Sequence, residues 1–98
     1  MGIIRINYTQ AIRESTRLKE INNDCRNINS LIDRLISQVP NYWEGEAARA
    51  FIDELNELKR ETSSIGQEAY DVGVTVKRVA DQIREAERRA IAAMNKQQ

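Results

Sequence analysis

One interruption divides this chain, and an apolar heptad pattern lies on each side of it. Pro40 lacks an amide hydrogen and favours the end of a helix, while Gly45 adopts turn conformations easily. Before Pro40, apolar or small residues alternate at steps of three and four, as in a coiled-coil seam. They are Leu18, Ile21, Cys25, Ile28, Ile32, Leu35 and Val39. The chain is therefore expected to form two long helices with a turn at residues 40–45.

The same alternation is more regular after the turn. Its members are Ala48, Phe51, Leu55, Leu58, Thr62, Ile65, Ala69, Val72, Val76, Val79, Ile83, Ala86, Ala90 and Ala93. We expect one helix over about 8–39, starting at a cap on Asn7, and a second over about 46–94. A short turn makes the helices antiparallel, so residues 1–98 form a single all-α hairpin with a flexible C-terminal end. The second helix should pass the start of the first near Val76 to Ala80 and extend beyond it as an overhang.

Composition excludes several functions. Fifteen basic and fifteen acidic residues cancel, so we expect no nucleic-acid binding. No stretch is long and apolar enough for a membrane span, and the first residues do not have the pattern of a cleaved signal peptide. Histidine is absent and Cys25 is the only cysteine, which argues against a Cys/His metal site, a cofactor or a small-molecule substrate. We therefore expect a protein that is not an enzyme, with Cys25 packed in the core.

A two-helix hairpin leaves both sides of its core open to water, so we expect a partner. Near the turn the apolar stripe widens, and farther along small residues recur every seven positions on one flank of the second helix. These residues are the predicted dimer face: Leu31, Ile36, Ile52, Gly66, Gly73 and Ala80. Two hairpins would form an elongated four-helix bundle.

The turn holds the only tryptophan, Trp43. Its ring is expected to cap the open end of the seam, and an anchoring role against a partner is compatible with that position. Gly45 is expected to supply unusual backbone dihedrals or a close approach of the helices.

A chain of about a hundred residues with two amphipathic helices and Trp43-Glu44-Gly45 in the turn resembles the WXG-100 family, the early-secreted-antigen-like substrates of type VII (ESX) secretion. The resemblance covers the whole chain and assigns Trp43 and Gly45 to the family motif. It implies a hairpin that pairs antiparallel with itself or with a paralogous hairpin into a four-helix bundle and leaves a Gram-positive cell folded. The resemblance further implies export to the extracellular space by a membrane secretion ATPase, without a cleaved signal peptide, and an association with virulence.

The resemblance also implies an export signal in the overhang. Paired members carry a C-terminal tyrosine followed four residues later by an acid, and neither Tyr8 nor Tyr70 has that acid. Members that pair with themselves carry an acid placed between apolar residues, a pattern that fits Ile83, Glu87, Ala90 and Met94. On this resemblance we expect a homodimer.

Two alternatives stay open on the sequence. The chain could be a small helical partner that escorts a larger type VII toxin, in which case it should be monomeric or poorly folded alone. It could also be a cytoplasmic structural coiled coil, for which Trp43 would be dispensable.

Overall fold

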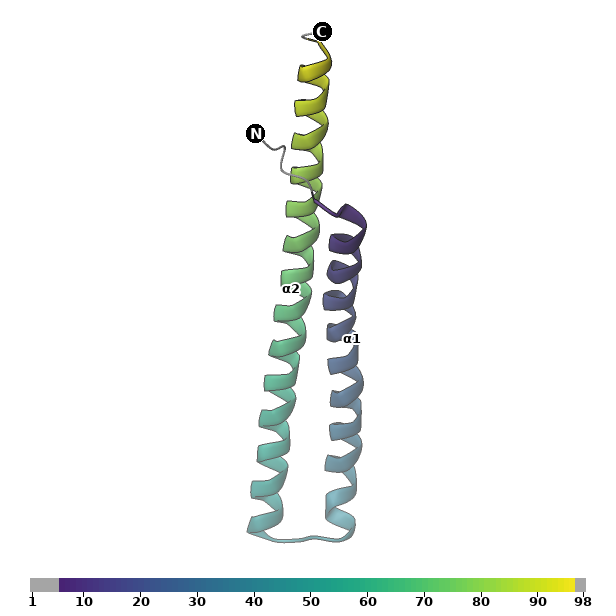
Figure 1. The fold of residues 1–98 in the computed structure, drawn as a ribbon. Helices are drawn as coiled ribbons and strands as arrows, with labels where there is room; N and C mark the ends of the chain where they lie inside the picture. Colours follow the sequence, from purple (N-terminus) through teal and green to yellow (C-terminus); the bar gives the residue numbers. More distant parts are fainter. Residues whose placement is uncertain (1–5, 97–98) are drawn as a thin grey trace.

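Two antiparallel helices form an elongated hairpin in the computed structural model, which describes residues 6–96 (Figure 1). Helix α1 spans Tyr8–Gln38, the 3-10 helix η1 spans Val39–Asn41, and α2 spans Glu46–Lys96. The principal-axis extents are 81 × 16 × 15 Å. The predicted all-α hairpin is confirmed. The expected flexible end falls partly on residues 97–98, which lie outside the described residues.

The start of α1 has the predicted cap. The Asn7 side chain accepts a hydrogen bond from the amide of Gln10 at 3.0 Å, which satisfies one of the free amides of the first turn. The Gln10 side chain does not complete a reciprocal capping box, since it donates to Glu14 at 2.9 Å. A single cap hydrogen bond therefore begins the helix.

Helix α1 ends at Gln38, within one residue of the expected end, but helical dihedrals continue past it. A proline disfavours helical dihedrals in the residue before it, yet Val39 has φ −53° and ψ −45° and its amide still donates to Leu35. Pro40 instead lies in the first turn of η1, where a missing amide hydrogen costs nothing. The chain leaves helical geometry only after Asn41, and the Val39 carbonyl accepts from the amides of Tyr42 and Trp43.

Gly45 begins α2 through its backbone conformation. Its φ is +96°, a region that side chains disfavour, and its carbonyl accepts from the amide of Arg49 at 3.1 Å. No atom lies within 4 Å of the position where a Cβ would stand. Of the two roles expected for Gly45, the structure supports the dihedral one and not a close approach of the helices.

Large side chains fill the half of the hairpin next to the turn. Ile32, Val39, Ala48 and Leu55 form a buried cluster, and three partly buried residues pack against it. Those residues are Ile36, Phe51 and Ile52. Ile36 and Ile52, predicted for a dimer face, therefore help to close the hairpin and keep part of their surface exposed.

Small residues bring the helices together in the distal half. Gly66, Gly73 and Ala80 are buried between α1 and α2. A Cβ on Gly73 would lie 2.8 Å from the carbonyl oxygen of Ser15, whose own hydroxyl donates to the Gly73 carbonyl at 2.7 Å. The three small residues therefore form the contact within the hairpin, which corrects their assignment to a dimer face. Close backbone approach leaves no room there for larger side chains.

Helix α2 continues well past the start of α1 (Figure 1). The Tyr8 hydroxyl meets the Asp81 carboxylate at 2.5 Å, one residue beyond the Val76 to Ala80 stretch expected from the sequence. The remainder of α2, to Lys96, is the overhang. None of the helices within residues 6–96 is long and apolar enough to cross a membrane.

Candidate interaction surface

An exposed apolar line runs along α1. Ile21, Ile28 and Leu35 are spaced by seven residues, so they lie one above another on the helix. The sequence placed them on the inward seam, but they are 38%, 47% and 36% exposed. The inward positions of this part of α1 are Cys25, buried as predicted, and Ile32.

A longer line of the same kind runs along α2. It consists of Phe51, Leu58, Ile65, Val72 and Val79, again at intervals of seven. Phe51 is half-buried by the turn, and the other four are exposed, Ile65 most of all at 58%. These five residues were also expected on the inward seam. The line along which α2 contacts α1 therefore lies to one side of these five residues.

Both lines lie on one face of the hairpin. On each helix the exposed line follows a buried line by three residues, as Ile28 follows Cys25 and Leu58 follows Leu55. Three residues rotate a helix by about 300°, equivalent to about 60° backwards. Because the helices are antiparallel and face each other, that same rotation moves both lines to the same side. We call Ile21, Ile28 and Leu35 together with Phe51, Leu58, Ile65, Val72 and Val79 the apolar face.

A shallow groove continues the apolar face at the end away from the turn. It has a volume of about 440 Å³ and is lined mostly by apolar side chains. The lining residues are Ile6, Ala11, Val72, Val76, Val79 and Ala80, together with Asp71 and Thr75.

The opposite side of the hairpin is polar. The Asn29 amide donates to the Lys59 carbonyl at 3.3 Å and to the Ser63 hydroxyl at 2.8 Å, and Asp33 forms an ion pair with Lys59. These contacts join α1 to α2, and the buried side-chain oxygen of Asn29 has no hydrogen-bond partner among the described residues. We call Asn29, Asp33, Lys59 and Ser63 the polar face.

Of the residues predicted for a dimer face, Leu31 alone is strongly exposed, at 58%. It lies three residues after Ile28 and four before Leu35, so it borders the apolar face. The apolar face itself was missed because its residues belong to the same heptad pattern as the inward seam. The glycines were the signal that could have located it, since small residues mark the line of closest helix contact.

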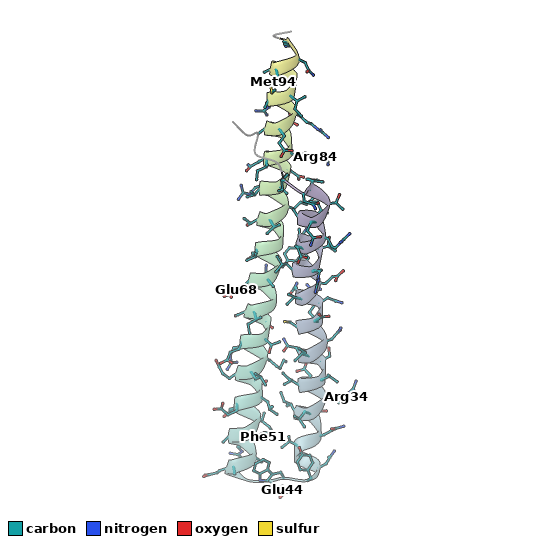
Figure 2. All side chains as sticks on the ribbon, viewed as in Figure 1. Arg34, Glu44, Phe51, Glu68, Arg84 and Met94 are labelled. Carbon is teal, nitrogen blue, oxygen red and sulfur yellow. The ribbon has the colours of Figure 1, made fainter. Side chains whose placement is uncertain are left out.

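The WxG turn lies at one end of the apolar face. The rings of Trp43 and Phe51 pack with centroids 5.4 Å apart and planes inclined by 38°. Trp43 covers this end of the hairpin and is still 39% exposed. Glu44 is exposed at the tip of the molecule, as Figure 2 shows. The ring thus adds an aromatic surface to the end of the apolar face.

The four residues of the expected export signal differ in exposure. Ala90 and Met94 are exposed in the overhang, whereas Ile83 and Glu87 are half-buried. The Glu87 carboxylate accepts a hydrogen bond from the backbone amide of Ile6 at 2.7 Å. The start of the described chain therefore covers part of this pattern, and only its C-terminal half is freely accessible.

A polar cluster secures the start of α1 against α2. The Asp81 carboxylate accepts from Lys77 at 2.8 Å and from the Tyr8 hydroxyl, and Arg84 stacks 4.2 Å from the centre of the Tyr8 ring. The hydrogen bonds from Lys77 and Tyr8 lower the pKa of Asp81 below its ordinary value of 3.8. The hydrogen bond to Asp81 raises the pKa of Lys77 above 10.5. Figure 2 places Arg84 near this junction.

Within residues 6–96 no three His, Cys, Asp or Glu side chains come together as they would around a metal ion. The single thiol, Cys25, is buried.

Comparison with known families finds a match over most of the chain. Residues 3–88 fit the profile of the WXG100 family, described as proteins of 100 residues with WXG. That range includes α1, the turn with Trp43 and Gly45, and α2 as far as Arg88. Neither the curated proteins nor the solved structures give a significant match.

Proposed function

Because this chain belongs to the WXG100 family, a family of small helical proteins associated with type VII secretion, we propose that it is an exported substrate that acts as a homodimer. Its work is protein–protein association rather than catalysis. The second copy covers the apolar face, and the overhang of α2 presents the export signal to the secretion ATPase.

The apolar face is the observation that carries this proposal. Full burial of a side chain such as Ile or Leu contributes roughly 1.5–3 kcal/mol, so covering one that is half exposed contributes roughly 1 kcal/mol. Seven such side chains on each copy give on the order of 14 kcal/mol per dimer. Association costs roughly 4–15 kcal/mol in lost translational and rotational freedom, so the gain from these side chains is comparable with the cost. The remaining contacts of the interface add to the gain. A patch of this extent is unusual on a monomer.

Association is tested with two valines of α2 that differ in the face they occupy. Val72 is 51% exposed on the apolar face, and Val74 is 44% exposed away from it. Val72→Glu places a charge where the second copy should lie, so it should dissociate a micromolar dimer into single chains, as measured by light scattering after gel filtration. Val74→Glu, with the same change of charge and helix propensity, should leave the dimer intact. Equal behaviour of the two variants refutes the proposed surface.

Export is tested on the overhang. Glu87→Ala should abolish appearance of the protein in the culture medium while circular dichroism and dimer mass stay unchanged. Glu85→Ala, an exposed acid outside the pattern, is the control and should be exported normally. Normal export of Glu87→Ala would remove the signal from the proposal.

The oligomeric state of the purified wild-type chain distinguishes the escort alternative from the homodimer. An escort without its larger partner should be monomeric at concentrations where a homodimer persists.

A further inference from the structure

The residues that lead into α1 lie against the overhang of α2 and contact the acid of the expected export signal. We propose that residues 6–8, which we call the arm, form a latch that covers Glu87 until the secretion ATPase displaces it. This inference rests on the export signal proposed above. It adds that the folded chain keeps its own signal partly closed, so that recognition includes an opening step.

Glu87 continues the line along which α2 contacts α1. Gly73 and Ala80 are buried on that line seven residues apart, and Glu87 is its next member. At this level α2 has passed the start of α1, as Figure 1 shows. The arm takes the place of α1 there, and the Ile6 amide donates to the Glu87 carboxylate at 2.7 Å. A half-buried carboxylate is thus paired with a backbone donor of the arm.

Tyr8 holds the arm in this position. Its hydroxyl donates to the Asp81 carboxylate at 2.5 Å, and the Arg84 guanidinium lies 4.2 Å from the centre of its ring. Asp81, Arg84 and Glu87 are spaced by three residues, so the three anchors follow one another along α2. Figure 2 shows Arg84 where the start of α1 meets α2. The arm is therefore attached to α2 at both of its ends, and its bond to Glu87 comes from the backbone of Ile6 rather than from the side chain.

The latch divides the expected signal into a closed part and an open part. Ile83 and Glu87 are half-buried, whereas Ala90 and Met94 are exposed. A receptor can contact the open part first, but it reaches the Glu87 carboxylate only after the Ile6 amide has left it. The receptor must then replace the lost donor, since a half-buried carboxylate without a hydrogen bond is unfavourable. We therefore expect an arginine, a lysine or a backbone amide of the ATPase at this position.

The strength of the latch follows from the balance between its closed and open forms. One hydrogen bond to a partly exposed charged group is expected to shift that balance about three- to tenfold. A receptor that binds only the open form has its apparent affinity reduced by the fraction of chains that are open. Loss of the hydrogen bond should therefore favour recognition, provided that Glu87 itself is still present.

Proline at position 6 removes the hydrogen-bond donor and leaves Glu87 in place. Ile6→Pro should raise the initial rate of export into the culture medium by about three- to tenfold, measured by pulse labelling. Ile6→Ala is the matched control, because it retains the amide and loses only the apolar side chain, and it should change the rate far less. Circular dichroism and dimer mass should stay unchanged in both variants.

Glu87→Ala separates a latch from a contact that only supports the fold. Ile6→Pro and Glu87→Ala break the same hydrogen bond, so a purely structural contact would change export in the same direction in both variants. The latch predicts opposite directions, because Ile6→Pro uncovers the acid and Glu87→Ala removes it. A decrease in export of both variants would overturn the latch.

Hydrogen exchange of the Ile6 amide, followed by NMR, measures the latch itself. The amide should exchange about three- to tenfold more slowly in the wild type than in Glu87→Ala. Equal exchange in the two proteins overturns the latch. Equal export of Ile6→Pro and Ile6→Ala, with Glu87→Ala not exported, also overturns it and leaves the proposed export signal standing. Normal export of Glu87→Ala removes the signal and the latch together.

Discussion

The polar and apolar faces of the hairpin lie on opposite sides of the same two helices, yet only the polar face is joined across the helices by polar contacts. On the polar face, Asn29 and Asp33 of α1 reach Lys59 and Ser63 of α2, and the buried Asn29 side-chain oxygen has no hydrogen-bond partner among the described residues. On the apolar face, seven largely exposed side chains project from both helices, and the eighth, Phe51, packs against Trp43 at the turn. The fold therefore leaves one side of the hairpin apolar and exposed, and this is the side on which we propose that a second copy packs.

The largest effect is expected from a charge at the middle of the apolar face. Ile65→Glu should weaken the dimer by more than about 100-fold, because an unpaired carboxylate would be buried against the second copy. Ser64→Glu adds the same charge one residue away, off the apolar face, and should change the dissociation constant little. Sedimentation velocity across a dilution series measures both. Similar constants for the two variants would erase the distinction between the faces.

A smaller effect, on the free energy of unfolding, is expected between the two faces, where α1 and α2 are in close contact. A Cβ on Gly73 would lie 2.8 Å from a backbone oxygen of Ser15, which cannot easily move. At Gly66 the atom at the same distance is the end of the Asn22 side chain, which can rotate. Gly73→Ala should therefore lower the free energy of unfolding by about 1–3 kcal/mol. The gain of about 1 kcal/mol in helix propensity is the same at both positions. Gly66→Ala should still cost less, because its closest contact can rotate away and the next, the Cβ of Cys25, lies at 3.0 Å.

Urea unfolding of the two alanine variants makes this comparison at one protein concentration. A Gly73→Ala protein more stable than Gly66→Ala would contradict the close approach at Ser15.

The polar face should respond more weakly. Asp33→Asn removes the ion pair with Lys59, and partly exposed pairs contribute about 1 kcal/mol or less. We expect a small decrease in melting temperature relative to wild type. The difference should disappear in about 1 M salt, because the Debye length there is only about 3 Å and the ion pair is screened. Dimer affinity should stay unchanged. Weakened association in Asp33→Asn would place part of the interface on the polar face.

The smallest effect concerns the polar cluster at the start of α1. The pKa of Asp81 is lowered in the folded chain by its hydrogen bonds to Lys77 and Tyr8, so this group stabilises the fold above its ordinary value of 3.8. That contribution is lost as the pH falls through 3.8 toward the folded-state pKa. The difference in melting temperature between wild type and Asp81→Asn should be present at neutral pH and shrink in acid. A difference that grows in acid would contradict the assigned hydrogen bonds.

The sequence predicts the hairpin well because its local signals agree. The cap on Asn7, the turn near Gly45 and the unbroken heptads leave one arrangement of two helices, and the structure has it. The exception is Pro40, which continues the chain as η1 because the first turn of a 3-10 helix tolerates a missing amide hydrogen.

The interaction surface could not be predicted in the same way. A three-four pattern marks two heptad lines on each helix without saying which faces the other helix and which faces a second copy. Leu55 is inward and Leu58 outward, although both fit the seam equally. The choice is made by Gly66 and Gly73, whose small size lets the backbones meet along a neighbouring line. That is a tertiary contact, and it becomes readable only when both helices are in place.

The mass of the unmodified chain in solution tests the central claim most directly. Sedimentation equilibrium from nanomolar to micromolar concentration should show twice the mass of one 11.3 kDa chain at the upper end, with helicity lost as the dimer dissociates. A single, fully helical chain that persists at micromolar concentration would contradict the claim that the apolar face requires a second copy.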